Sequence, residues 1–91
     1  MVTATKKRPM RPGWRKDGDG ASIRLCGKGA AQLHATEESH GWAWEAYALD
    51  GNLFDYGTAT TEAAAQRKAD AALLRAAKRL AKAAGLRLAT P

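Results

Sequence analysis

The segment from Thr60 to Ala84 constrains the fold more than any other part of the chain, because it is the longest stretch with a helical pattern. Small and apolar residues recur along it every three or four positions, as they do on one side of an α-helix. Thr60 or Thr61 can cap its start, and Gly85 is typical of the position just after a helix. Glu62 suits the positive end of the helix dipole. We therefore predict one long amphipathic helix.

Six basic residues gather on one flank of this predicted helix. Within roughly a third of the circumference lie Arg67, Lys68, Arg75, Lys78, Arg79 and Lys82. Pairs at i,i+4 spacing, such as Arg75 with Arg79, carry like charges, whereas an ordinary solvated helix alternates Glu with Lys. Asp70 is the only acidic residue beyond the first turn. At about 1.5 Å per residue the basic residues span roughly 22 Å, enough to follow several phosphates.

Two interpretations of this stripe stay open. It contacts a polyanion, or it is a solvated face, because charge runs usually serve solubility. A GC-rich genome would also enrich Ala and Arg without a functional cause. The missing acidic partners favour the first interpretation.

Charge is distributed unevenly along the 91 residues, which carry a formal net charge of +6. Residues 1–20 hold six basic and two acidic groups, residues 21–59 hold two and five, and residues 60–91 hold seven and two. An acidic middle between basic ends favours acidic or polyanionic partners and salt-sensitive association. The length allows one domain with a small core.

Cys26 is the single cysteine, so the chain can form no internal disulfide, which fits a reducing cytosol. The N-terminus lacks the apolar segment of a signal peptide, and no apolar run is long enough to cross a membrane. We expect a soluble, cytoplasmic protein.

Residues 1–20 are rich in charge, Pro and Gly and have no periodic apolar pattern, so we predict a disordered basic arm. Its basic residues surround Trp14, a ring that can stack on bases, and they are Lys6, Lys7, Arg8, Arg11, Arg15 and Lys16. The arm is either a contact surface for nucleic acid or a plain solvated tail.

Ser22 to Thr36 reads as a β-hairpin with its turn at Gly27 to Gly29. Folding about Lys28 would place Ile23 opposite Leu33 and Leu25 opposite Ala31, so that four apolar residues share one face. Arg24 and Gln32 would then pair on the other face, and His34 would point away from the core. Residues 37–41 are predicted to form a polar loop.

A second hairpin is predicted from Gly41 to Leu49 and from Leu53 to Gly57, with a turn at Gly51 and Asn52. One face would carry Trp42, Trp44, Ala46, Ala48 and Leu53, and the other would carry Glu45, Tyr47, Leu49, Phe54 and Tyr56. An alanine-rich helix needs large partners to fill the core, so we expect the tryptophan face to meet the helix. The aromatic face would then be an interface, or a second layer would cover it.

The predicted fold is therefore α+β, a three- or four-stranded antiparallel β-meander followed by one long C-terminal helix packed on one face. We expect an arm at residues 1–20, a single domain at residues 21–85 and a frayed tail at residues 86–91.

Catalysis is not expected, and neither is a cofactor or a metal site. His34 and His40 are the only histidines, and Cys26 shows no zinc-binding spacing with them. The acidic pairs, Glu37 with Glu38 and Asp17 with Asp19, do not match a calcium loop. The segment from Gly27 to Gly29 is too short for a phosphate-binding loop and reads as a turn.

Gly57-Thr58-Ala59 followed by an alanine-rich helix resembles the last strand and helix of double-stranded-RNA-binding domains. The resemblance covers about 30 residues and implies the fold of that half. The basic segment with which the family grips phosphate is replaced here by Thr61, Glu62, Ala64 and Ala65.

Gly41-Trp42-Ala43-Trp44 and the segment from Gly57 to Ala65 resemble small proteins of phages and other mobile elements, including some anti-CRISPR inhibitors. This resemblance implies a non-catalytic inhibitor that occupies a surface on a host complex in a bacterial cytoplasm.

Two functions follow as expectations. In the first, the chain is a binding module for nucleic acid or a nucleoprotein, with contacts from the six helix residues and from Lys6, Lys7, Arg8 and Arg11. In the second, it is a phage-encoded inhibitor that docks on a host protein through Tyr47, Leu49, Phe54 and Tyr56, because aromatic residues dominate such interfaces.

Overall fold

The computed structural model describes residues 10–27 and 31–83 of the chain. Five strands precede one helix: β1 (Trp14–Lys16), β2 (Ala21–Cys26), β3 (Ala31–Glu38), β4 (Gly41–Ala48), β5 (Leu53–Ala59) and α1 (Glu62–Ala83). The predicted α+β fold, an antiparallel meander followed by one long helix, is confirmed. The sheet has one strand more than the four-stranded form of the prediction.

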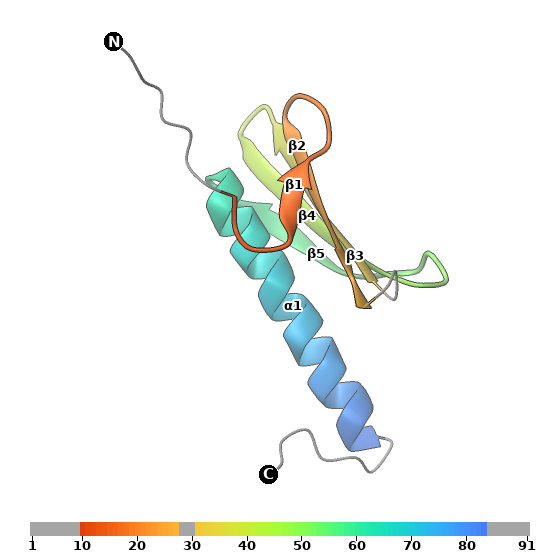
Figure 1. The fold of residues 1–91 in the computed structure, drawn as a ribbon. Helices are drawn as coiled ribbons and strands as arrows, with labels where there is room; N and C mark the ends of the chain where they lie inside the picture. The colour runs from red at the N-terminus through yellow and green to blue at the C-terminus, as the bar shows by residue number, and fades with distance from the viewer. Residues whose placement is uncertain (1–9, 28–30, 84–91) are drawn as a thin grey trace.

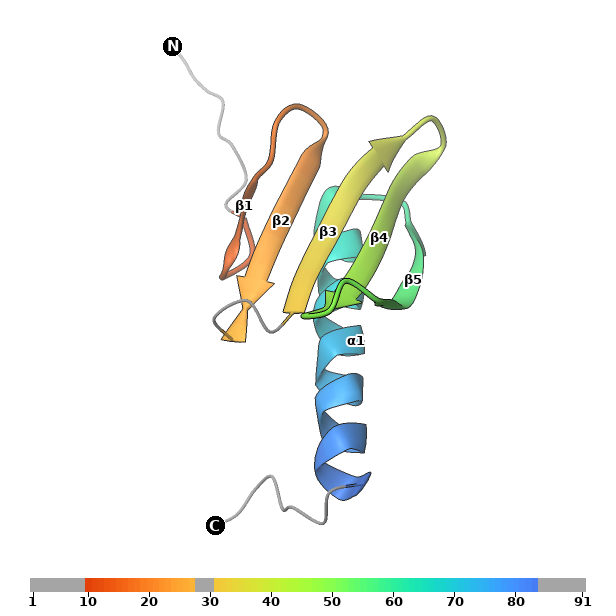
Figure 2. The same cartoon turned by 90° about the vertical axis from the view of Figure 1, so that its right-hand side faces the viewer.

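The five strands lie in chain order, and each is antiparallel to the next. Helix α1 crosses one face of this sheet, and its last turns extend beyond the sheet (Figures 1 and 2). Within the described part of the chain the helix leaves the opposite face uncovered (Figure 2). We call that face the open face.

Helix α1 begins at Glu62, where Thr61 is the N-cap, because its side-chain Oγ1 accepts a hydrogen bond of 3.1 Å from the backbone N–H of Ala64. The helix reaches Ala83. The predicted end at Gly85 and the tail at residues 86–91 lie outside the described residues.

The core lies between small residues of α1 and the larger side chains of the sheet. Fully buried alanines line the helix side, namely Ala65, Ala69 and Ala72, and they pack with Leu33, Ala35, Trp44 and Ala46. Small side chains let a helix approach a sheet closely, so that the Trp44 ring can fill the space. Gly57 makes room for that ring, because a Cβ at this position would lie 2.8 Å from the Trp44 Nε1. The prediction that Trp44 faces the helix is confirmed.

The predicted register of the first hairpin is wrong by one residue. Ile23 pairs with His34, Arg24 with Leu33, and Leu25 with Gln32. A slip of one residue moves every side chain to the other face, so Ile23 and Leu25 lie on the open face and not in the core. His34 also lies on the open face, away from the core, as predicted.

Polar residues of β2 take the helix side because α1 supplies their partners. The side chain of Gln66 is 2% exposed, and its Nε2 donates a hydrogen bond of 2.9 Å to the Ser22 Oγ. Buried polar groups need such partners to avoid a desolvation penalty of about 1–3 kcal/mol. The local sequence shows that Ser22 is polar, but it does not show that its partner, Gln66, lies 44 positions further along the chain.

Two loop predictions also need correction. The turn predicted at Gly51 and Asn52 is longer, because β4 ends at Ala48 and β5 starts at Leu53, which leaves residues 49–52 as the connection. Residues 37–41 are not a loop, because β3 runs to Glu38 and β4 starts at Gly41, which leaves a turn of Ser39 and His40. In the second hairpin the pairing shifts between Ala46 and Tyr47, where a β-bulge breaks the alternation.

The bulge exchanges two residues between the faces of β5. Tyr47 pairs with Leu53, whereas Ala46 pairs with Asp55, so Phe54 is the additional residue. Phe54 packs against the core on the helix side, and Leu53 is exposed. Both had been predicted on the opposite faces.

The prediction that residues 1–20 form a disordered arm is wrong from Trp14 onward, because residues 14–16 form β1 and pair with β2. Trp14 is 5% exposed and packs in the core, so its ring is not free to stack on bases. Residues 1–9 lie outside the described residues.

A single carboxylate attaches β1 and β2 to the helix. The Asp70 side chain accepts hydrogen bonds from Trp14 Nε1 at 3.0 Å, from Arg24 Nη1 at 2.6 Å and from Arg11 Nε at 2.9 Å. Trp14 belongs to β1, Arg24 to β2, and Arg11 to the segment before β1. The Asp70 side chain is largely buried. We call this group the Asp70 cluster.

We predict that Asp70→Ala lowers the free energy of unfolding by about 2–3 kcal/mol, because it leaves two guanidinium groups and an indole N–H without their acceptor. Urea denaturation measures the loss. Asp55→Ala is the matched control, because it breaks an exposed ion pair worth less than about 1 kcal/mol. A loss for Asp70→Ala no larger than that for Asp55→Ala would contradict the structural role of the cluster.

Candidate anion-binding surface

The six predicted basic residues of α1 lie on its surface as one group, which we call the basic flank. Its members are Arg67, Lys68, Arg75, Lys78, Arg79 and Lys82, and all six are exposed. The core-facing alanines occupy the other side of the same helix. The flank therefore leaves its side chains available to a partner along about four turns of the helix.

Few of these cations are neutralised by the protein itself. Arg75 forms an ion pair of 3.3 Å with Asp55, and Lys68 Nζ donates a hydrogen bond of 3.0 Å to the backbone carbonyl of Thr58. Both contacts are exposed and contribute little to stability. Within the described residues, the other members of the flank make no ion pair.

The acidic residues of the helix lie away from the flank. Asp70 is held by Arg11 and Arg24 in the Asp70 cluster. Glu62 lies 3.9 Å from Lys16 of β1, and its side chain is largely buried. The helix therefore sets no carboxylate of its own against the basic flank.

The predicted arm residues do not join this surface in the described part of the chain. Arg11 binds Asp70, at the edge of the sheet opposite β5. Arg15 and Lys16 are exposed on β1 at that same edge. Lys6, Lys7 and Arg8 lie outside the described residues.

The open face carries part of the predicted protein interface. Tyr47 and Tyr56 both lie there, and Tyr56 is 69% exposed. Leu49, just beyond the end of β4, is also exposed. Phe54 is absent from this face because the bulge turns it toward the helix. Two residues that the sequence had assigned to the core, Leu25 and Leu53, are exposed.

Tyr47 is held by two neighbours on the open face. Its hydroxyl donates a hydrogen bond of 2.8 Å to Glu45 Oε1, and its ring meets the His34 ring edge to face at 5.4 Å. The hydrogen bond to the Glu45 carboxylate, with smaller contributions from burial and charge repulsion, raises the pKa of Tyr47 above the ordinary tyrosine value.

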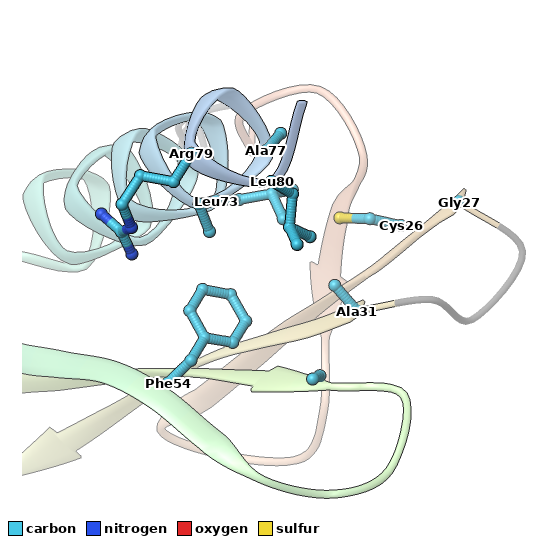
Figure 3. A pocket seen from close by; sticks show the side chains of 10 residues that line it. Cys26, Gly27, Ala31, Phe54, Leu73, Ala77, Arg79 and Leu80 are labelled. Carbon is cyan, nitrogen blue, oxygen red and sulfur yellow. The ribbon is translucent and has the colours of Figure 1, made fainter. Parts of the chain in front are cut away.

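An apolar groove that the sequence did not predict opens where α1 leaves the sheet (Figure 3). It has a volume of about 700 Å³ and lies between Phe54 of β5, Cys26 of β2, and Leu73 and Leu80 of α1. Burial raises the pKa of the Cys26 thiol, and the charge of Arg24 opposes this effect. Leu80 is 71% exposed at the rim, beside Arg79 of the basic flank.

Comparisons with protein-family models, with curated proteins and with solved structures found no match for this chain. In the part of the chain that the structure describes, no helix is both long and apolar enough to cross a membrane. Nor do residues 10–27 and 31–83 hold a group of three or more His, Cys, Asp or Glu side chains that could share a metal ion.

We predict that Glu45→Gln lowers the pKa of Tyr47 toward the ordinary tyrosine value, because the amide removes the negative charge that opposes the phenolate. The measurement is a titration of phenolate absorbance in a Tyr56→Phe background, where Tyr47 is the only tyrosine. An unchanged midpoint would contradict the assigned cause.

Proposed function

We propose that this chain is a non-catalytic binding module that engages a nucleic acid or a nucleoprotein through the basic flank of α1. The observation that carries the proposal is the separation of charges on the helix. Its cations are exposed on one flank, whereas Asp70 is bound by Arg11 and Arg24 away from that flank, and Glu62 lies 3.9 Å from Lys16. Such a surface attracts phosphates with few internal counter-charges to displace, since Arg75 is the one member with an ion pair in the described residues.

The geometry supports positioning by phosphate contacts and not sequence reading. The flank lies on a convex helix surface, and its side chains are long, exposed and all cationic. Lys and Arg contacts to phosphate fix register and orientation, whereas sequence is read through base edges. The expected behaviour is strong salt dependence with little sequence preference.

We predict that Lys78→Gln together with Lys82→Gln weakens binding to a nucleic acid duplex about tenfold at low salt. The slope of log K against log salt should fall in magnitude by about 2, because two phosphate contacts are lost. Fluorescence anisotropy over a salt series measures both quantities. These two residues lie one helical turn apart, and neither has an ion-pair partner within the described residues.

The matched control for this test is Arg15→Gln with Lys16→Gln, which removes the same charge from β1 at the other edge of the sheet. We expect it to change affinity less than twofold. Equal losses in the two double variants would show that net charge, and not the flank, attracts the ligand. Full affinity in Lys78→Gln/Lys82→Gln would contradict the proposal.

The second candidate is an inhibitor that docks on a host protein through the open face, as the resemblance to phage-encoded anti-CRISPR proteins implies. What favours it is the exposure of large apolar side chains on an uncovered sheet, among them Tyr56, Leu53 and Leu25. Aromatic residues in such positions are typical of protein interfaces.

For this candidate we predict that Tyr47→Ser with Tyr56→Ser abolishes capture of a host protein, because it removes both open-face tyrosines, while leaving nucleic-acid affinity intact. A pull-down from nuclease-treated bacterial lysate measures capture, and the Lys78→Gln/Lys82→Gln variant is the control that should keep it. Undiminished capture by the tyrosine variant, or capture lost on nuclease treatment, would exclude the open face.

A further inference from the structure

A cleft with both polar and apolar lining residues lies at the end of the molecule, between the β3–β4 turn, the end of β5 and the start of α1. Its volume is about 900 Å³. The strands and the turn line it with Glu38 at the end of β3, Ser39 and His40 of the β3–β4 turn, Trp42 of β4, and residues 58–60 at the end of β5. Helix α1 lines it with Ala64, Arg67 and Lys68. None of the functions above uses the turn residues or Trp42.

The cleft and the basic flank share two residues. Arg67 and Lys68 line the cleft and also form the N-terminal end of the flank. The hydrogen bond from Lys68 Nζ to the Thr58 carbonyl, 3.0 Å long, spans the cleft wall from helix to strand. A strand of nucleic acid that follows the flank would therefore arrive at the cleft with its phosphates on these two side chains.

Trp42 gives the cleft an aromatic wall. The other two tryptophans, Trp14 and Trp44, are 5% and 6% exposed and belong to the core, whereas Trp42 is only partly buried at the core's margin. Every nucleobase has a π-face that stacks on such a ring, and this stacking tolerates any sequence. A base inside a duplex has both of its faces covered, so only an unstacked base can use Trp42.

The two walls of the cleft carry different charges, so they suit different parts of a nucleotide. Glu38 is the one acidic residue in the lining, and it lies with His40 on the turn side. A carboxylate repels phosphate but accepts hydrogen bonds from the N–H groups of a base. Arg67 and Lys68 lie on the helix side and attract phosphate. These charges favour a nucleobase beside the turn and its phosphate beside the helix.

From these observations we infer that the cleft binds one unstacked nucleobase of a single-stranded nucleic acid, stacked on Trp42, with its phosphates on Arg67 and Lys68. The inference rests on the proposed function and names its ligand more closely. It requires that the chain prefer single strands to duplexes of the same sequence.

The test compares three probes by fluorescence anisotropy and competition: a labelled single-stranded oligonucleotide, its duplex, and heparin, which is a polyanion without bases. We expect Trp42→Leu to lose about tenfold in affinity for the single strand and less than twofold for the duplex and for heparin. Trp42→Phe, which keeps an aromatic ring, should keep most of the affinity. Lys78→Gln/Lys82→Gln should weaken binding of all three probes.

A second measurement does not depend on how well Trp42→Leu folds. Saturation with the single strand should quench the tryptophan emission of the unaltered chain, and Trp42→Phe should remove that quenching, because Trp14 and Trp44 are buried. Emission that does not change at saturation would overturn the inference, as would equal loss of heparin and single-strand affinity in Trp42→Leu. Binding of heparin but of neither oligonucleotide would also overturn the inference, although the flank would still be a surface that binds polyanions. Failure to bind any of the three probes would overturn the proposed function as well.

Discussion

The Asp70 cluster is the interaction on which the arrangement of this small domain depends. One carboxylate at the middle of α1 accepts hydrogen bonds from Trp14, Arg24 and Arg11. It fixes the helix to the two N-terminal strands, which α1 also contacts through the hydrogen bond from Gln66 to Ser22 and the ion pair of Glu62 with Lys16. The same contact withdraws the only interior acid of the helix from its surface. The structure and the proposed function therefore depend on the same side chain.

The core shows how a chain with few large residues fills its interior. Three alanines of α1 let the helix approach the sheet closely. The Trp44 side chain fills the space between helix and sheet, and Gly57 leaves room for its indole ring. This close packing ends where α1 extends past the sheet (Figure 1). Beyond that point the apolar residues of the helix line an open groove, and Leu80 is mostly exposed.

The sequence was enough to predict the features that depend on local patterns. The helical repeat of Thr60 to Ala84 predicted α1, and the volume argument placed Trp44 toward it. The basic flank followed from the same repeat, because 3.6 residues per turn determine which side chains share a side. Its six residues are all exposed in the structure.

The errors arose where partners distant in the chain decide the outcome. The inward positions of β2 are held by Ser22 and Arg24, whose partners on α1 lie more than 40 positions away, so the apolar pattern gave the wrong register. The bulge at Phe54 leaves no signal in a strand that is apolar on both faces. Trp14 looked like part of a basic arm because its acceptor, Asp70, is 56 positions distant.

The cleft could not be predicted for a related reason. It combines a turn between two strands with the start of a helix, and no sequence motif joins Trp42 to Arg67. Only the meander, which returns β5 beside β4 and then leads into α1, brings these residues together.

The central claim is that phosphates bind along one flank of α1, and amide chemical-shift mapping by NMR tests it most directly. On titration with a short single-stranded oligonucleotide, we expect the amide chemical shifts of residues 64–82 and of the β3–β4 turn to change. The amide chemical shifts of β1 and β2 should not change. Shifts concentrated on the open face, around Tyr47 and Tyr56, would contradict the account.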